Sequence, residues 1–120
     1  MKITSAESLV MAALWRRQPL GADEIAAEVA PSQGWSAATV KTLINRLLTK
    51  KAIAAEPEGR RYLYRPLVAR DAYVNTEAQG LLDRLFDGRL APMVSHLSQA
   101  RALTPDDIAE LKRLIAEIEE

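Results

Sequence analysis

The segment of residues 36–70 holds the side chains best suited to contact a polyanion. Eight basic residues occur there against only two acidic ones, Glu56 and Glu58. Lys and Arg neutralise phosphates, and this electrostatic term supplies much of the affinity of proteins for nucleic acids. The segment therefore predicts a nucleic-acid surface, and its basic residues are Lys41, Arg46, Lys50, Lys51, Arg60, Arg61, Arg65 and Arg70.

The formal net charge of the 120-residue chain is zero, but the charge is unevenly distributed. Residues 1–70 carry 11 basic and 6 acidic residues, a net charge of +5. Residues 71–120 carry 5 basic and 10 acidic residues, a net charge of −5. Such asymmetry indicates a basic binding surface joined to an acidic module with another task. We expect a DNA-binding domain in residues 1–70 and a dimerisation domain in residues 71–120.

A predicted helix from Ser36 to about Lys51 would carry the contacts to bases. Ser36 suits the N-cap, and the helix buries one apolar arc that includes Val40, Leu43 and Leu47. The opposite arc offers small and hydrogen-bonding side chains with cations at its edges, a pattern that suits base edges surrounded by phosphates. Its members are Ala38, Lys41, Thr42, Asn45, Arg46 and Thr49. The alternative is an ordinary solvated face, on which more Glu and Lys are expected.

A β-hairpin is expected after this helix, because short strand-like segments flank a turn at residues 57–59. Arg60 and Arg61 beside the turn suit contact with phosphates or with the minor groove. Alternatively, their like charges protect a strand edge from pairing. Tyr62 and Tyr64 share one face of the second strand, and we expect both to pack on the helices.

Two helices are expected before Trp35. The first begins at Thr4 or Ser5, with Thr4 and Glu7 forming a capping box, and the second spans about residues 22–29 and is ended by Pro31. Residues 31–35 are then a turn, in which we expect Trp35 to wedge into the core; the lesser alternative is that its indole N–H reaches a phosphate. The order helix, helix, turn, helix, hairpin is that of a winged helix-turn-helix.

The pattern in residues 71–120 is helical throughout and indicates three helices, with a closing Gly88 after the first and Thr104 at the start of the last. This segment has too many large apolar residues to bury by itself, so we expect it to pair with a symmetry mate. The expected dimerisation residues are Tyr73, Leu81, Leu82, Leu85, Phe86, Ile108, Leu111, Ile115 and Ile118. The predicted fold class is mainly α with a small β-hairpin wing: a winged helix-turn-helix followed by a helical dimerisation region.

Residue types that serve catalysis, redox chemistry or metal binding are scarce. The chain has no Cys and a single His, His96, while the adjacent Asp106 and Asp107 suit helix capping better than acid–base chemistry. No glycine loop of the phosphate-cradling type occurs. We therefore expect no enzyme, no cofactor and no metal site. A cytoplasmic protein is the default expectation, because no apolar run reaches the roughly 18 residues of a membrane span and no signal-peptide layout is present.

Several motifs occur together at family-like spacing: Trp35-Ser36, residues 39–47, Glu58-Gly59-Arg60 and residues 62–66, with further matches at Ala6-Glu7, Met11, Leu14-Trp15, Phe86-Asp87-Gly88 and Met93-Val94. Over nearly the whole chain these motifs resemble the penicillinase repressor family, which includes BlaI and MecI and has the CopY copper repressors as relatives. The CopY branch binds metal through C-terminal cysteines, which this chain lacks.

The resemblance implies a homodimeric transcriptional repressor that binds a palindromic operator in double-stranded DNA, often in antibiotic-resistance circuits. It also implies a membrane sensor-metalloprotease as partner, and relief of repression by cleavage in the C-terminal domain. The candidate cleavage region is Ser95, His96 and Leu97, in which His96-Leu97 replaces the typical Asn-Phe pair.

The full set of expected DNA-binding residues is Trp35, Ser36, Ala38, Thr39, Lys41, Thr42, Asn45, Arg46, Lys50, Arg60 and Arg61. Two other function classes stay open. One is a winged-helix protein–protein adaptor. The other is a small-molecule-responsive regulator whose C-terminal helices enclose a ligand pocket.

Overall fold

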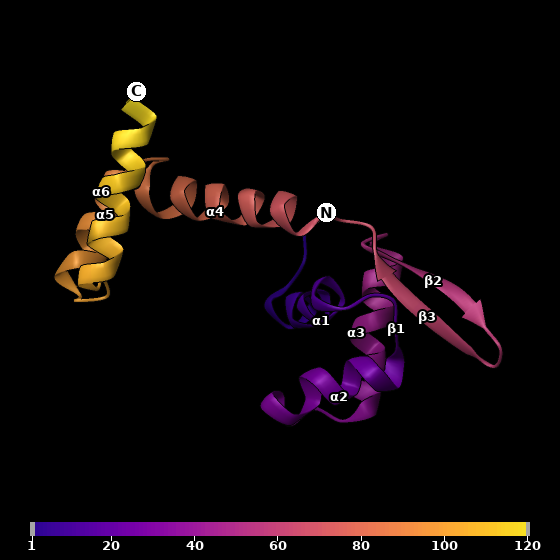
Figure 1. Ribbon diagram of the computed structural model, residues 1–120. Coiled ribbons are helices and arrows are strands. Elements are labelled where there is room, and N and C mark those ends of the chain that lie inside the picture. The colour runs from indigo at the N-terminus through magenta and orange to yellow at the C-terminus, as the bar shows by residue number, and fades with distance from the viewer. Residues whose placement is uncertain (1, 120) are drawn as a thin grey trace. The chain divides into compact units, whose positions relative to one another are not determined.

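The computed structural model describes residues 2–119, which form six helices and one small antiparallel sheet (Figure 1). The chain divides into two compact units: unit 1 ends at Tyr73 and unit 2 begins at Val74. The elements are α1 (Ser5–Arg16), β1 (Leu20–Gly21), α2 (Ala22–Gln33), α3 (Ala37–Thr49), β2 (Ile53–Glu58), β3 (Arg61–Pro66), α4 (Arg70–Phe86), α5 (Leu90–Gln99) and α6 (Pro105–Glu119). The predicted class, mainly α with a small β wing, is confirmed.

Unit 1 is held together by one hydrophobic core, to which α1, α2, α3 and the sheet all contribute. Its largest fully buried side chains include Met11, Leu14, Ile25, Ile44 and Leu47. Full burial of each such side chain stabilises a fold by about 1.5–3 kcal/mol. The core thus fixes the three helices and the sheet of unit 1 relative to one another.

Local sequence determines where the first and third helices begin. The Thr4 hydroxyl accepts the Glu7 N–H at 3.2 Å and the Glu7 carboxylate accepts the Thr4 N–H at 2.8 Å, which confirms the predicted capping box. Ser36 caps α3 as predicted, because its hydroxyl accepts the Thr39 N–H at 3.2 Å. Both contacts satisfy amides that a helix start leaves unpaired.

Helix α2 continues through Pro31 and ends at Gln33, so the predicted stop at Pro31 is wrong. Proline lacks the N–H that would bond to the carbonyl four residues back, and its ring crowds that carbonyl, but the last turn of α2 accommodates Pro31. Gly34 ends the helix instead. Its φ of 68° is in the left-handed region that favours glycine, and its N–H donates to the Ala30 carbonyl at 2.7 Å.

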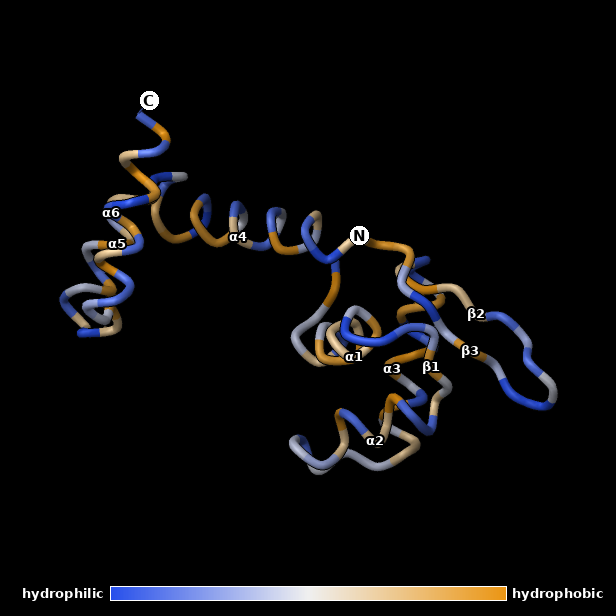
Figure 2. Tube along the Cα trace, in the orientation of Figure 1, coloured by the Kyte–Doolittle hydropathy of each residue, from blue (hydrophilic) through white to orange (hydrophobic). Residues whose placement is uncertain are grey.

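The sheet of unit 1 has the strand order β1-β3-β2, and both pairings are antiparallel. Strands β2 and β3 form the wing, which extends from the helices (Figure 1) and is hydrophilic toward its tip (Figure 2). Glu58 pairs with Arg61, so the turn is Gly59-Arg60, and Gly59 has a φ of 61°. The prediction of a turn over residues 57–59 is therefore wrong by one residue. The two-residue strand β1 was not predicted, because it is too short to alternate.

The two wing tyrosines have different surroundings. Tyr64 is buried, with 8% of its surface exposed, and lies opposite Leu20 of β1. Tyr62 is 56% exposed and pairs with Pro57. The prediction that both pack on the helices is thus wrong for Tyr62. The two residues share a strand face, but Tyr62 is nearer the tip, beyond the short stretch where β1 pairs with β3.

Trp15 ties the chain that follows the sheet to α1. Its indole N–H donates to the Val68 carbonyl at 2.9 Å, and its ring centroid lies 5.4 Å from that of Tyr73. In both contacts the partner of Trp15 lies more than 50 positions later in the sequence. Tyr73, one of the expected dimerisation residues, is half-buried and packs against the core of unit 1.

Unit 2 comprises the rest of α4 together with α5 and α6. Thr104 and Asp107 cap α6 reciprocally, with N–H to oxygen distances of 3.1 and 3.2 Å. None of the residues 74–119 is fully buried. The large apolar side chains that stay exposed in this unit are Val74, Leu81, Leu85, Leu90, Ile108, Leu114, Ile115 and Ile118.

Candidate nucleic-acid interface

One side of α3 is exposed, and we refer to it as the α3 outer face: Ala38, Lys41, Thr42, Asn45, Arg46 and Thr49. The other side of the helix is held in the core by Val40, Leu43, Ile44 and Leu47, each 4% exposed or less. Because four side chains anchor the helix, rotation about its axis would bury polar groups. The outer face is therefore presented in a fixed orientation.

Hydrogen bonds within the helix constrain the threonines of this face. The Thr42 hydroxyl donates to the Ala38 carbonyl at 3.0 Å, and the Thr49 hydroxyl donates to the Asn45 carbonyl at 3.0 Å. Each hydroxyl hydrogen is thus occupied, while the oxygen lone pairs and the methyl group remain free for a ligand. At the start of α3, Ser36 and Thr39 share a hydroxyl–hydroxyl contact of 3.1 Å and are occupied with capping.

Unlike the two threonines, three polar side chains of the α3 outer face make no hydrogen bond or ion pair within residues 2–119: Lys41, Asn45 and Arg46. A shallow groove of about 330 Å³ runs along this face and is lined by Thr42, Asn45, Arg46, Thr49 and Lys50. It combines an amide, which both donates and accepts, with hydroxyl oxygens and a guanidinium group. This is the donor and acceptor set that base edges and phosphates require.

The two wing arginines differ in their contacts. Arg60 is exposed at the turn and has no ion-pair partner within the described chain. Arg61 Nη1 lies 3.2 Å from Glu24 Oε1 and 3.9 Å from Asp23 Oδ1, and half of its side chain is exposed. The exposed phenol of Tyr62 follows on the same strand. Sequence reasoning missed Tyr62 as a candidate contact, because alternation alone assigned it to the packed face.

Two of the expected DNA-binding residues point into the protein rather than away from it. Trp35 is half-buried and packs against the core. The Lys50 ammonium forms an ion pair with the carboxylate of Glu7, which is completely buried. Burial by itself raises the pKa of Glu7, but hydrogen bonds from Lys50 and Thr4 outweigh it and hold the pKa below its ordinary value. Glu7 is therefore a buried carboxylate that requires a cation.

The family model for the penicillinase repressor matches residues 3–117. The chain belongs to the penicillinase repressor family. The penicillinase repressor of Bacillus licheniformis is 28% identical over 116 residues, which cover 97% of this chain and 91% of that protein. The methicillin resistance regulatory protein MecI of Staphylococcus aureus strain N315 is 26% identical over 114 residues, with 95% and 93% coverage.

A solved structure gives the same assignment. The monomeric form of Bacillus licheniformis BlaI, in complex with the blaP half-operator, has a TM-score of 0.54 and 30% identity and covers 61% of this chain and 89% of its own. These relatives are repressors and not enzymes, as the sequence led us to expect. The resemblance to the penicillinase repressor family is thus confirmed.

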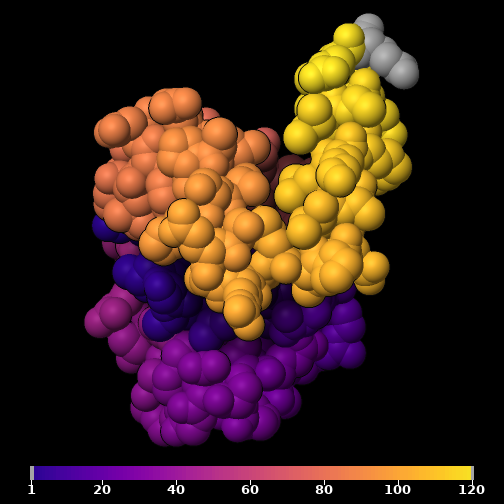
Figure 3. Space-filling model, turned by 90° about the vertical axis from the view of Figure 1, so that its left-hand side faces the viewer, coloured from indigo at the N-terminus to yellow at the C-terminus, as the bar shows by residue number. Residues whose placement is uncertain are grey.

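In this member of the penicillinase repressor family, the four expected dimerisation residues of α6 line an apolar groove. Ile108, Ile115 and Ile118 of α6 are exposed, and Leu111 is half-buried. The groove has a volume of about 830 Å³ and is lined by Leu90, Ala91, Val94, Ser95, Ser98, Leu103, Ile108, Leu111, Lys112, Leu114, Ile115 and Ile118. Figure 3 shows the end of α6, in yellow, projecting beyond the orange helices of this unit. Leu81 and Leu85 of α4 are exposed as well, while Leu82 and Phe86 are half-buried.

The candidate cleavage region lies within α5. Ser95 and His96 are exposed and Leu97 is half-buried, and the His96 ring lies 6.3 Å from that of Phe86. Among residues 2–119, no three acidic, His or Cys side chains gather as a metal site. No helix in the same range is long and apolar enough to cross a membrane.

Proposed function

We propose that this chain is a transcriptional repressor that binds double-stranded operator DNA through the α3 outer face and the wing. The observation that carries the proposal is the exposed, unpaired state of Lys41, Asn45 and Arg46 on a helix whose opposite side is locked in the core. An asparagine amide suits a bidentate contact with adenine, and flanking cations suit phosphates. The likeness to BlaI solved with a half-operator supports the same proposal.

The test separates base contacts from phosphate contacts. A preferred duplex is selected from random sequences, and affinity is then measured by fluorescence anisotropy on that duplex and on an unrelated one. Thr42→Ala and Asn45→Ala should weaken binding to the selected duplex by roughly 1–3 kcal/mol and hardly change binding to the other. Lys41→Ala and Arg46→Ala should weaken both. Equal losses on the two duplexes for Asn45→Ala would contradict its role in base recognition.

We further propose that unit 2 forms a homodimer, so that two copies of α3 reach the halves of a palindromic operator. The support is the apolar groove along α5 and α6, together with the exposed Ile108, Ile115 and Ile118. A two-fold partner buries the same surface on both copies. Binding both half-sites through one dimer raises the effective concentration for the second contact, which supplies the affinity that repression needs.

Sedimentation of the full chain tests this part. Ile115→Asp places a charge in the groove and should yield monomers whose operator affinity is reduced by orders of magnitude. Ala116→Asp is the matched control, because Ala116 is exposed on the same helix and does not line the groove. A dimer that persists in Ile115→Asp would exclude this groove as the interface.

The family resemblance extends the proposal to a cytoplasmic repressor that is inactivated after a membrane sensor-metalloprotease is triggered. Ser95, His96 and Leu97 lie inside α5, so cleavage there requires local unwinding of the helix. Mass spectrometry of the chain recovered from cells exposed to a β-lactam should detect a fragment that ends in this region. An intact chain in induced cells would refute cleavage as the release step.

A small-molecule-responsive regulator is the second candidate function, and the apolar groove of about 830 Å³ favours it because pockets for small ligands have this size. A full chain that stays monomeric, and so leaves this groove uncovered, would support the small-molecule-responsive regulator. A protein–protein adaptor would instead show no salt-dependent affinity for DNA.

A further inference from the structure

Glu7 and Lys50 form a part-buried ion pair between the first turn of α1 and the end of α3, in which the Lys50 side chain keeps 30% of its surface exposed. Glu7 has no exposed surface, and its Oε1 accepts hydrogen bonds from both the Lys50 ammonium and the Thr4 N–H. The ammonium also donates to the Lys2 carbonyl at 2.6 Å. The two residues are 43 positions apart in the sequence, so the contact depends entirely on the tertiary fold.

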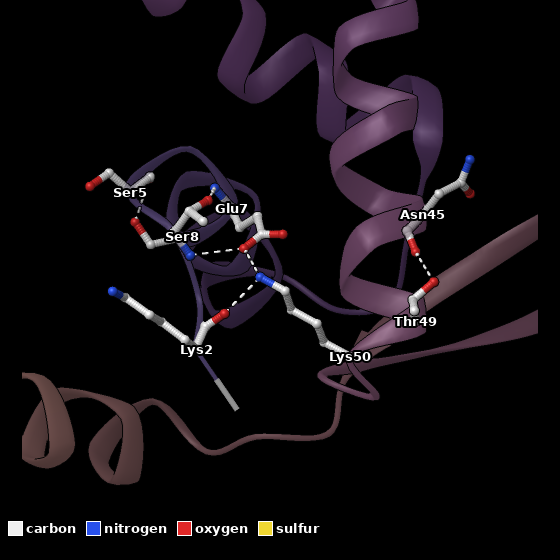
Figure 4. Close-up of polar contacts among 8 residues, drawn as sticks. Lys2, Ser5, Glu7, Ser8, Asn45, Thr49 and Lys50 are labelled. Atoms are coloured by element: carbon white, nitrogen blue, oxygen red, sulfur yellow. Dashed lines mark hydrogen bonds and ion pairs between the residues drawn. The ribbon is translucent and has the colours of Figure 1, made fainter.

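Lys50 lies at the edge of the proposed DNA surface but directs its charge away from it. It is the C-cap residue of α3 and lines the same groove as Thr42, Asn45 and Thr49. Figure 4 shows the Lys50 side chain running toward Glu7, whereas Asn45 and Thr49 lie on the other side of the helix. One ion pair thus ties the C-terminal end of α3 to the start of α1.

The Glu7 carboxylate depends strongly on this cation. Its second oxygen, Oε2, is buried and has no hydrogen-bond partner among the described residues. Removing the cation leaves the charge of the buried Glu7 uncompensated, which is strongly destabilising, whereas removing both charges of such a pair costs much less. By contrast, the side chains of Arg65 and Glu56 are each about half exposed, and exposed ion pairs of that kind contribute little to stability.

We propose that Glu7 is a positioning residue for DNA binding, which acts through Lys50 to fix the C-terminal end of α3. Lys50 accordingly compensates the negative charge of Glu7 and does not contact a DNA phosphate. The inference rests on the proposed function, because it assumes that α3 enters the DNA. It assigns a role in DNA affinity to a residue that the solvent, and hence the DNA, cannot reach.

The variants Lys50→Met, Glu7→Gln and the double variant test the proposal in the full chain. Each single variant should weaken binding to the selected duplex by roughly tenfold, within the range of couplings between residues in contact. Neither should change the slope of log affinity against log salt, because no phosphate contact is lost. The double variant should bind more tightly than Lys50→Met, since it removes the uncompensated charge. Lys51→Met is the matched control, because Lys51 is exposed and has no described side-chain partner; it should leave the urea unfolding midpoint unchanged.

The competing role for Lys50 gives opposite results. If Lys50 contacts a phosphate, Lys50→Met should lower the salt slope by roughly 0.9, Glu7→Gln should not weaken binding, and the double variant should bind no better than Lys50→Met. Any of these results overturns the inference while leaving the proposed function intact. If the unmodified chain binds no duplex, the proposed function fails and the inference fails with it. Urea unfolding of each variant shows whether it is folded at the temperature of the titration.

Discussion

Arg60→Ala and Arg61→Ala should change the salt dependence of operator binding by different amounts, although the residues are adjacent. Arg60 has no ion-pair partner in the described chain, whereas Arg61 lies 3.2 Å from Glu24 Oε1. An exposed ion pair contributes only about 0–1 kcal/mol, so a phosphate can displace Glu24 from Arg61. Breaking the ion pair with Glu24 nevertheless costs free energy, which offsets part of the affinity that the phosphate contact of Arg61 contributes.

The magnitude follows from counterion release. One phosphate contact contributes about 0.9 to the slope of log affinity against log salt. Arg60→Ala should therefore lower the slope by about 0.9, which makes the loss of affinity between 50 and 200 mM salt about 3.5-fold smaller. Arg61→Ala should lower the slope by less. Glu24→Gln should strengthen binding, because it frees Arg61 and retains an oxygen for the Gly21 N–H that Glu24 accepts at 3.0 Å.

Anisotropy titrations at four or more salt concentrations measure these slopes. Arg65→Ala is the control for loss of a wing charge away from the turn, because Arg65 is paired with Glu56 at 2.7 Å. Equal slopes for Arg60→Ala and Arg61→Ala would show that the contact with Glu24 has no influence. An unchanged slope for Arg60→Ala would refute the contact between the wing and a phosphate. The remaining role for the two arginines would then be to keep a strand edge from pairing.

Three further predictions concern stability. The folded-state pKa of Glu7 is lowered from 4.5, so the stability that its ionised carboxylate contributes is present above pH 4.5 and is lost as the pH falls through the folded-state pKa. In urea unfolding, Glu7→Gln should therefore lose less stability on acidification than the unmodified chain, and equal losses would contradict this. Gly80→Ala should stabilise α4 by about 1 kcal/mol in thermal unfolding, because an added Cβ meets no atom within 4 Å; a lower melting temperature would refute it. Leu47→Ala should cost roughly 2–5 kcal/mol in urea unfolding, because Leu47 is completely buried, and a loss under 1 kcal/mol would indicate a poorly packed core.

The sequence was most informative where structure is decided by neighbours along the chain. The Thr4-x-x-Glu7 pattern and Ser36 specify helix starts by hydrogen bonds that span three residues, and both predictions are confirmed. The exposed side of α3 also follows from the spacing of Val40, Leu43 and Leu47 alone. These features need no knowledge of the tertiary fold.

The errors arose where distant segments decide the outcome. Tyr62 and Tyr64 are equivalent by alternation, and only the pairing of β3 with β1 separates them. Lys50 and Arg61 were expected to contact DNA, but each forms an ion pair with a carboxylate, 43 and 37 positions away respectively. Pro31 failed as a stop signal because the helix continues past it to Gly34, whose left-handed backbone ends α2.

The contacts of Trp15 also have a spectroscopic consequence. The chain has two tryptophans, Trp15 and Trp35, which pack beside different elements of unit 1. Trp15 touches Tyr73 where α4 begins, and Trp35 packs just ahead of α3. In a Trp35→Phe variant, emission would report only on the junction with α4. In a Trp15→Phe variant, it would report only on the approach to the DNA-facing helix. The unlabelled protein thus carries two intrinsic fluorophores that single substitutions separate, one for the start of α4 and one for the approach to α3.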